Sequence, residues 1–514
     1  MPARTVMVQG TASSVGKSVL VTGLCRMLRQ DGWRVAPFKA QNMALNAHVT
    51  LDGGEIGRAQ AVQAEAAGLV ATVDMNPILL KPEGDSRAQV VVLGKAIGSM
   101  AAAEYHAKKP ELLRIVAESF ERLRSDYDVV VLEGAGSPAE VNLRDRDIVN
   151  MHMARMADAP VILVGDIDRG GVFAALVGTL ELLEREDRAR VVAFIVNKFR
   201  GDLALLRPGL DFLENRTRVP VLGVVPHIAG LRIADEDSLG LESRPRRRTV
   251  KPEELEIAVV HLPRISNYDE FESLEHEPGV VLSFADDPRR VEDADLVIVP
   301  GSKSTIADLA WLRETGFASV IHERGRRRAP VLGICGGCQM LTEHIDDPHR
   351  VESLTATTVE GLGLLAARTY FVSVKTTARV VARPAGGGFF AQEVPRDARL
   401  EGYEIHMGQI RTNSERDAAF EIVERNARPH RVADGAIGCG GAVVGTMIHG
   451  LFDNDLLRSA VLRALRRRKG APEPPAPAST PTKQLEYDRL ARIVRESIDP
   501  QRFAGIVGLS AVLQ

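Results

Sequence analysis

Cysteine is scarce in this sequence, and so are long apolar runs and any excess of one charge. Four cysteines among 514 residues are too few and too scattered for a disulfide framework, so we expect a reducing, cytoplasmic setting. No apolar stretch is long enough to span a bilayer, and we expect no secretory leader because Met1 runs directly into a strand-like segment. The formal net charge is only −3, which predicts neither nucleic-acid nor anionic-membrane binding.

The first half of the chain alternates short apolar runs with longer helical patterns. Six runs rich in Val and Ile are bounded by glycines or turn residues, which is typical of strands buried on both faces. Between them lie patterns such as KSVLVTGLCRMLRQDG, where apolar residues recur at helical spacing. This alternation predicts a doubly wound parallel sheet. The six expected strands are TVMVQG, WRVAPFKA, YDVVVLEGAG, APVILVGDID, RVVAFIVNKF and VPVLGVVP.

A second α/β series begins after the basic, proline-containing stretch SRPRRRTVKPEE, a composition typical of chain that joins domains. A chain of 514 residues also exceeds what one hydrophobic core usually organises. After Gly470 a low-complexity segment precedes apolar residues that share one helical face. The predicted fold class is therefore α/β with two doubly wound domains, residues 1–245 and 252–470, followed by a linker and a docked helix at 471–514. The strands expected in the second domain are LEIAVVHL, DADLVIVPG, APVLGIC and GAVVGTMIH.

The first expected strand runs directly into GTASSVGKS and then into a helix. Gly10, Thr11 and Gly16 lie in a loop whose backbone can wrap an anion, while the amides of the following helix point at it. Lys17 adds a positive charge, and the Ser18 hydroxyl can bind magnesium. A glycine-rich turn with a chance lysine is the alternative. Five residues, not the usual four, separate Gly10 from the Gly16–Lys17 pair, an insertion that resembles dethiobiotin synthetase and its relatives.

A nucleotide site of this kind needs an acidic group beyond a neighbouring strand. Glu133 ends the run YDVVVLE and is our candidate for the metal, with a carboxylate that caps the next turn as the alternative. Asn197 and Lys198 end another expected strand, where they would lie near the nucleotide base. Together these residues predict binding of a nucleotide with Mg²⁺.

Two connections, residues 38–60 and 75–85, carry more polar groups than loops usually need. Amide and charged side chains on loops at one sheet edge suit recognition of a large polar substrate, although ordinary solvated loops have the same composition. The candidate substrate-binding residues are Lys39, Gln41, Asn42, Asp52 and Lys81.

Cys335 and Cys338 lie three apart in VLGICGGCQM. A zinc site would need about two more ligands, and no second pair of cysteines exists. A redox dithiol is harder to dismiss, because a helix N-terminus after Cys-x-x-Cys lowers the pKa of the first thiol. A single nucleophile, Cys335, is the third reading, and Cys338 would then be a small packing residue.

The surroundings of Cys335 favour the nucleophile. Glycines on both sides permit the sharp strand-to-helix turn that exposes a nucleophile at a sheet edge. The amide of Gly336 can donate to an oxyanion, and the loop that begins at Gly301 can supply a second donor. His449 ends another expected strand and is the best-placed base for the thiol.

With these residues in hand, the second domain resembles a class I glutamine amidotransferase, in which the elbow and histidine match GICGGCQ and His449. The whole chain resembles the cobyric acid synthase family. That resemblance implies a dethiobiotin-synthetase-like domain joined to a flavodoxin-like glutaminase. It implies that ATP activates the b, d, e and g carboxylates of adenosylcobyrinic acid a,c-diamide as acyl phosphates, and that ammonia from L-glutamine then converts them into the amides of cobyric acid. The motifs that carry it are GTASSVGKS, FKAQNMALN, DGGEIGRAQ, MNPILLKP, LEGAGSPAEVNL, DIDRGG, NKFRGD, PGSKST and GYEIHMG.

The sequence departs from many class I glutaminases after the histidine. Those enzymes carry a glutamate two residues on, whereas Leu451 stands there in this chain. A Cys–His dyad or another orienting group is implied, with Glu404 and His406 as candidates by their place in GYEIHMG. For lack of the usual carboxylate, we expect glutamine hydrolysis to be slow until ATP and the corrinoid are bound.

Two other functions compete with this one. Cobyrinic acid a,c-diamide synthase has the same two domains and chemistry but acts on the a and c carboxylates. A partitioning-type nucleotide-switch ATPase shares the unusual phosphate loop, but it has no use for a glutaminase elbow. The oligomeric state is not predicted.

Overall fold

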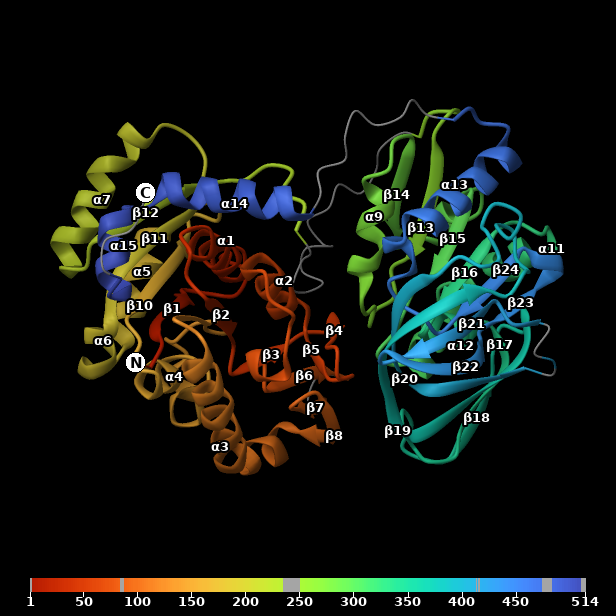
Figure 1. Ribbon diagram of the computed structural model, residues 1–514, viewed down its shortest axis with the longest axis horizontal. Coiled ribbons are helices and arrows are strands. Elements are labelled where there is room, and N and C mark those ends of the chain that lie inside the picture. Colours follow the sequence, from red (N-terminus) through yellow and green to blue (C-terminus); the bar gives the residue numbers. More distant parts are fainter. Residues whose placement is uncertain are drawn as a thin grey trace. The chain divides into compact units, whose positions relative to one another are not determined.

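A computed structural model describes residues 2–83, 87–233, 250–412, 414, 417–473 and 483–509. Its contacts divide the chain into two compact units (Figure 1). The first contains Met1–Ala44, Glu55–Glu236 and Thr480–Gln514, and the second contains Leu45–Gly54 and Asp237–Ser479. The two segments predicted as linkers lie largely outside the described residues.

The first unit is built on a six-stranded parallel sheet in the order β12-β11-β10-β1-β9-β2. Its strands fall in the six apolar runs that the sequence predicts. They are β1 (Arg4–Gly10), β2 (Val35–Phe38), β9 (Val129–Glu133), β10 (Val161–Asp166), β11 (Val191–Phe199) and β12 (Val221–Pro226).

Alternate side chains of this sheet enter two different buried layers. On β1, Val6 and Val8 lie in one apolar cluster with residues of α1 (Lys17–Gln30), whereas Met7 lies in another with residues of α3 (Ala102–Asp126). Both faces of the sheet are therefore covered, which explains why its strands read as unbroken apolar runs. The other helices of this unit are α2 (Arg58–Ala67), α4 (Met151–Met156), α5 (Val172–Leu182), α6 (Arg185–Arg190), α7 (Leu203–Thr217), α14 (Lys483–Ser497) and α15 (Pro500–Val507).

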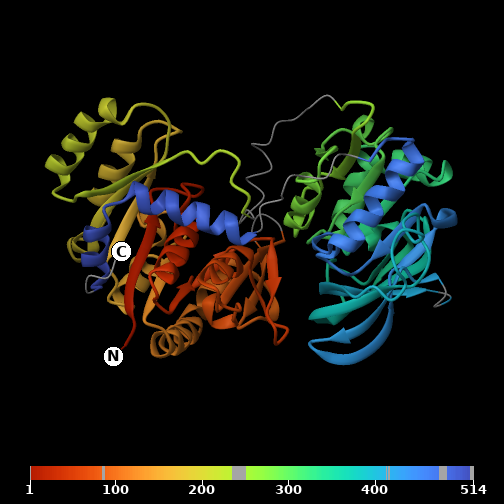
Figure 2. The ribbon, with the colours of Figure 1, turned by 45° about the horizontal axis from the view of Figure 1, so that its top comes forward.

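Helix α14, the predicted helix near the C-terminus, belongs to the first unit and runs alongside α1 (Figures 1 and 2). The side chain of Val494 faces Gly23 of α1, where a Cβ atom would lie only 2.7 Å from Val494 Cγ2. Arg26 forms an ion pair of 2.7 Å with Asp488, and Asp499 donates its N–H to the Leu222 carbonyl of β12. The helix predicted from the apolar face therefore docks on the nucleotide-binding part of the chain.

A small mixed sheet in the order β3-β6-β7-β8 adds to the first unit. It contains polar connections that were predicted as loops. Its strands are β3 (Gln41–Met43), β6 (Ile78–Pro82), β7 (Arg87–Val92) and β8 (Lys95–Ala101). The short strand β5 (Glu55–Gly57) also belongs to the first unit, whereas β4 (Ala47–Val49) belongs to the second.

The second unit contains a sheet in the order β14-β13-β15-β16-β24-β23, parallel except for β23. The four strands predicted from the sequence lie next to one another in it. The bounds are β13 (Leu255–Val260), β14 (Val280–Ala285), β15 (Leu296–Val299), β16 (Val331–Ile334), β23 (Ala436–Gly438) and β24 (Val443–Thr446), with helices α9 (Glu272–Glu275), α10 (Thr305–Glu314), α11 (Phe317–Arg326), α12 (Gly336–Leu341) and α13 (Asp455–Lys469).

A second sheet in this unit was not predicted. It runs in the order β18-β17-β19-β21-β22, with β20 paired antiparallel to β19. Its strands are β17 (Thr342–Asp347), β18 (Thr357–Glu360), β19 (Leu365–Pro384), β20 (Leu400–Thr412), β21 (Phe420–Arg425) and β22 (Arg428–Asp434). The predicted α/β class with parallel sheets is confirmed, and this additional sheet carries the GYEIHMG motif on β20.

Candidate active sites

The phosphate loop joins β1 to α1, as the motif predicts. Gly16 has a φ of 95°, in the left-handed region that favours glycine. A Cβ atom there would lie 2.3 Å from Asn197 Nδ2, and that amide donates to the Val15 carbonyl at 2.8 Å. Lys17 Nζ donates to the carbonyl oxygens of Ala12 and Gly136. The loop residues and Asn197, at the end of β11, are therefore brought together.

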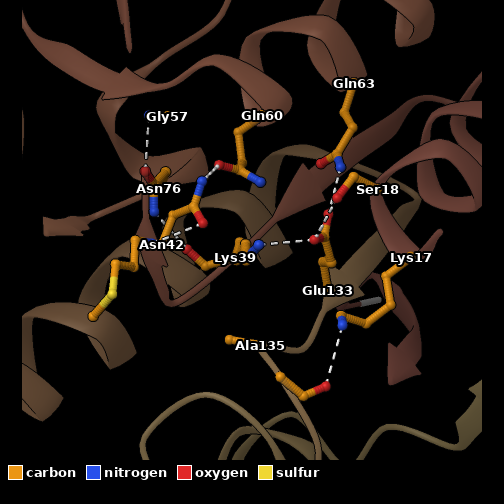
Figure 3. A network of polar contacts seen from close by, with 12 residues as sticks. Lys17, Ser18, Lys39, Asn42, Gly57, Gln60, Gln63, Asn76, Glu133 and Ala135 are labelled. Atoms are coloured by element: carbon orange, nitrogen blue, oxygen red, sulfur yellow. Dashed lines mark hydrogen bonds and ion pairs between the residues drawn. The ribbon is translucent and has the colours of Figure 1, made fainter. Parts of the chain in front are cut away.

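Glu133 lies at the centre of a buried polar network (Figure 3). Its Oε1 accepts hydrogen bonds from Ser18 Oγ at 2.9 Å and from Lys39 Nζ at 2.8 Å. Its Oε2 accepts from Gln63 Nε2 at 2.5 Å. The two residues proposed for the metal are thus in contact, and a predicted substrate residue, Lys39, pairs with one of them.

The hydroxyl and carboxylate oxygens of Ser18 and Glu133 are hard donors, the type that Mg²⁺ prefers. In the described part of the chain, no group of three or more His, Cys, Asp and Glu side chains could hold a metal ion. A magnesium ion at a phosphate loop needs only one or two protein ligands, because water and phosphate oxygens supply the rest. The donor set therefore fits Mg²⁺.

The other predicted substrate residues have partners within the chain. Asn42 Nδ2 donates to Gln60 Oε1 at 3.0 Å (Figure 3), and Lys81 forms a buried ion pair of 2.7 Å with Glu55. Gln41 accepts a hydrogen bond from the Tyr105 hydroxyl, and Asp52 from that of Thr50. Lys198 Nζ lies between the Ser14 carbonyl and Asp166 Oδ2.

Cys335 occupies a strained turn between β16 and α12. Its φ of 50° is unusual for a residue with a side chain and costs about 1–3 kcal/mol. The turn requires glycine at position 337, where a Cβ atom would lie 1.8 Å from the Val299 carbonyl oxygen. The Sγ atom of Cys335 lies 3.6 Å from the Ile405 carbonyl oxygen of β20. This is the geometry of a nucleophile elbow.

Two backbone N–H groups lie beside this turn. A Cβ atom on Gly336 would lie 2.7 Å from the nitrogen of Ser302, so Gly336 and Ser302 approach closely. Ile265 and Ser302 face each other in a short antiparallel bridge. The hydrogen bonds of this bridge are made by their neighbours: Ser266 N–H donates to the Gly301 carbonyl, and Lys303 N–H donates to the Arg264 carbonyl. The N–H of Ser302 therefore points away from the bridge. Gly301, the predicted donor, lies beside the His449 ring.

His449 follows β24 and is fully buried. Its Nδ1 lies 2.9 Å from Glu270 Oε1, and Glu270 Oε2 accepts the N–H of Gly450 at 3.0 Å. The ring of Tyr403 is stacked on the imidazole at 5.2 Å and 13°. Burial lowers the pKa of His449, but the Glu270 carboxylate and the nearby Cys335 together raise that pKa to about 10.

The remaining motif residues have other partners. Glu404 and His406 bind each other at 3.2 Å, and Glu404 also pairs with Arg425. The suggestion that Glu404 or His406 orients His449 is therefore corrected, because Glu270 occupies Nδ1. Cys338 packs against Gly445, and burial, with help from Asp434 and Cys335, raises the pKa of its thiol well above the usual value.

Two residues of these sites were not found from the sequence, namely Gln63 and Glu270, whereas Ser302 lies within the loop 301–305 that was predicted to supply the second donor. A signal for Glu270 does exist. It lies in SNYDEFE, just beyond β13, and sites in parallel sheets form at the carboxyl ends of the strands.

Two family models match the chain. The CobQ/CobB/MinD/ParA nucleotide binding domain matches residues 6–240, and the CobB/CobQ-like glutamine amidotransferase domain matches residues 256–457. A protein of Sorangium cellulosum named cobyric acid synthase is 60% identical over 99% of both chains. Proteins of the same name from Syntrophobacter fumaroxidans and Klebsiella pneumoniae are 50% and 51% identical, over 99% and 96% of both chains.

The chain belongs to the cobyric acid synthase family. Membership confirms the resemblance drawn from the motifs, and with it a nucleotide-binding domain and a glutamine amidotransferase domain in one enzyme. Within the described ranges, no helix is long and apolar enough to cross a membrane.

Proposed function

We propose that this chain catalyses the ATP- and glutamine-dependent amidation of the b, d, e and g carboxylates of adenosylcobyrinic acid a,c-diamide, which gives cobyric acid. The observation that carries the proposal is 60% identity over 99% of the chain to a relative named cobyric acid synthase. The two sites described above suit the two halves of such a reaction.

The first half-reaction takes place at the phosphate loop. A carboxylate oxygen of the corrinoid attacks the γ-phosphorus of ATP, so that ADP leaves and an acyl phosphate forms. Lys17 and the loop amides stabilise the negative charge of the phosphates, and Asn197 lies where it can contact the nucleotide. Ser18 and Glu133 would hold Mg²⁺, which neutralises phosphate charge when bound.

The corrinoid would bind the polar connections at residues 38–60 and 75–85. Lys39 is the strongest candidate, because its ammonium group lies next to Glu133 and suits an anionic carboxylate. Gln41, Asn42, Asp52 and Lys81 remain proposed residues of these substrate loops. The buried pairing of Asn42 and Lys81 indicates that these two act by holding the loops in shape.

The second half-reaction releases ammonia at Cys335. The thiolate attacks the carboxamide carbon of glutamine, His449 gives a proton to the departing ammonia, and a glutamyl thioester forms. The amides of Gly336 and the loop at Gly301 and Ser302 stabilise the oxyanion. Water activated by His449 then releases glutamate, while ammonia attacks the acyl phosphate and expels phosphate.

Cobyrinic acid a,c-diamide synthase remains the alternative assignment, since both sites would serve it equally. The test supplies ATP, magnesium and glutamine with either cobyrinic acid or adenosylcobyrinic acid a,c-diamide. Mass spectrometry should show four amidations of the a,c-diamide and none of cobyrinic acid at the a and c positions. Amidation at a and c would overturn the assignment in favour of the alternative.

A further inference from the structure

His449 has a carboxylate partner that comes from an unexpected place in the chain. Glu270 lies in the short helical turn Tyr268–Phe271, which follows β13, whereas His449 follows β24. In the sheet these strands are separated by β15 and β16. The two residues are far apart in the sequence, so the pair cannot be found from local motifs. The strands are parallel, however, and their carboxyl ends therefore lie at the same edge of the sheet.

The carboxylate holds two groups at once. Its Oε1 lies 2.9 Å from His449 Nδ1, and its Oε2 accepts the N–H of Gly450 at 3.0 Å. The Glu270 side chain is only 2% exposed and that of His449 is 0% exposed. A buried carboxylate is costly unless it is paired and hydrogen-bonded, and here both oxygens have partners on the loop that carries the histidine.

The pairing determines which nitrogen of the imidazole is available for chemistry. A carboxylate on Nδ1 fixes the proton there, which leaves Nε2 for exchange with the thiol. Among the described residues Nε2 has no hydrogen-bond partner, and Cys335 is close enough to raise the pKa of His449. The ring of Tyr403 covers one face of the imidazole, so rotation of the ring is also restricted.

We propose that Glu270 is the positioning residue of the glutaminase site and takes the place of the glutamate that many class I glutaminases carry two residues after the histidine. This inference rests on the proposed roles of Cys335 and His449. Glu270 acts through His449: it orients the ring, favours the imidazolium and so favours the thiolate of Cys335. The groups that face the imidazole are Glu270, Cys335 and Tyr403.

The test compares Glu270→Gln with Glu277→Gln in the full chain. The amide keeps the shape of the glutamate side chain but loses its charge. Glu277 offers a matched control, because it forms an ion pair of 2.6 Å with Arg458 in the same region of the chain and contacts neither Cys335 nor His449 in the described structure. Three quantities are measured. They are the rate of glutamate release, the rate of synthesis from added ammonia, and the pH dependence of Cys335 alkylation by iodoacetamide. Mass spectrometry of peptide fragments detects the alkylation of Cys335.

Glu270→Gln should lower kcat for glutamate release by about 100-fold and move the midpoint of Cys335 alkylation upward by about one pH unit or more. The direction follows because loss of the carboxylate lowers the pKa of His449 and with it the stability of the thiolate–imidazolium pair. Synthesis from ammonia should stay at the wild-type level. Glu277→Gln should leave all three quantities unchanged.

The Glu270→Asp variant keeps the negative charge at position 270 and shortens the side chain, so it tests the effect of charge separately from the effect of geometry. It should restore the alkylation midpoint while kcat stays below wild type, because the shorter side chain holds the ring less well. A midpoint like that of Glu270→Gln would overturn the electrostatic role, and so would a Glu270→Gln variant with wild-type kcat and midpoint. The Cys335→Ser variant tests the proposed nucleophile separately from Glu270. If this variant still hydrolyses glutamine, Cys335 is not the nucleophile, and the proposed role of Glu270 is then wrong as well.

Discussion

Cys335 is the proposed nucleophile that would release ammonia from glutamine. If it forms the glutamyl thioester, Cys335→Ser should abolish glutamine-dependent synthesis and leave synthesis from added ammonia largely intact, because the phosphate-loop site is unchanged. The matched control is Cys338→Ala, which removes a buried thiol that packs against Gly445 and should have little effect. Equal loss with both nitrogen sources would contradict the assignment, and a redox-dependent loss in Cys338→Ala would favour a dithiol.

We assign Lys17 to the other proposed half-reaction, at the phosphate loop. If the proposal is right, replacing it with Ala removes a positive charge that would lie next to the transferred phosphoryl group, and such a charge contributes about 10³-fold in related chemistry. Synthesis should fall with glutamine and with ammonia alike, as measured by ADP and product formation. Glutamate release serves as the internal control and should persist. Near-normal synthesis from ammonia would show that Lys17 is outside the working site.

The sequence predicted those residues whose role depends on their local surroundings. The phosphate loop and the elbow at Cys335 are contiguous motifs, so a single stretch of chain contains both their glycines and their reactive groups. Glu270 could not be assigned in this way, because its partner lies 179 residues away and only the strand order brings the two together. The same holds for the contact between Lys39 and Glu133.

At the scale of elements, prediction succeeded where strands are buried on both faces. The ten apolar runs all became strands of the two parallel sheets. The long strands β19 and β20 were missed because exposed and half-buried residues interrupt their apolar positions. The predicted strands were the unbroken apolar runs, whereas a half-exposed strand shows alternation of apolar and polar residues instead.

The contact between α1 and α14 leads to a stability prediction. At Gly23, a Cβ atom would lie 2.7 Å from Val494 Cγ2 and 3.2 Å from Leu490 Cγ. Gly23→Val should therefore overpack this contact and lower the free energy of unfolding by about 1–3 kcal/mol. The matched control is Gly178→Ala in α5, where a Cβ atom would meet nothing within 4 Å and helix propensity favours Ala by about 0.5–1 kcal/mol.

Thermal unfolding of the two variants gives the measurement. The transition of Gly23→Val should begin at lower temperature than that of the wild-type chain, and the transition of Gly178→Ala should be equal or higher. An unchanged transition in Gly23→Val would show that α14 does not pack on α1. A lowered transition in Gly23→Val would show that α14 stabilises α1, the element that begins at Lys17 of the phosphate loop.

For the whole molecule, the question is whether glutamine hydrolysis waits for the other substrates. The sequence alone suggested that it does, because no carboxylate stands two residues after His449. That reason no longer holds once Glu270 is seen on Nδ1. Cys335, Gly336, Ser302, Glu270 and His449 all belong to one unit of the chain.

We therefore expect glutamate release from glutamine alone, at a rate within about tenfold of that with ATP and corrinoid present, since the proposed catalytic groups are already together in one unit. The measurement is glutamate release in the four combinations of ATP and adenosylcobyrinic acid a,c-diamide, with Cys335→Ser as the blank. If both substrates together raised the rate by about 100-fold, the assembled site would have to be inactive at rest. In that event Glu270 would orient His449 without being sufficient for activity, and the Glu270→Gln variant should lose the stimulated rate as well as the basal one.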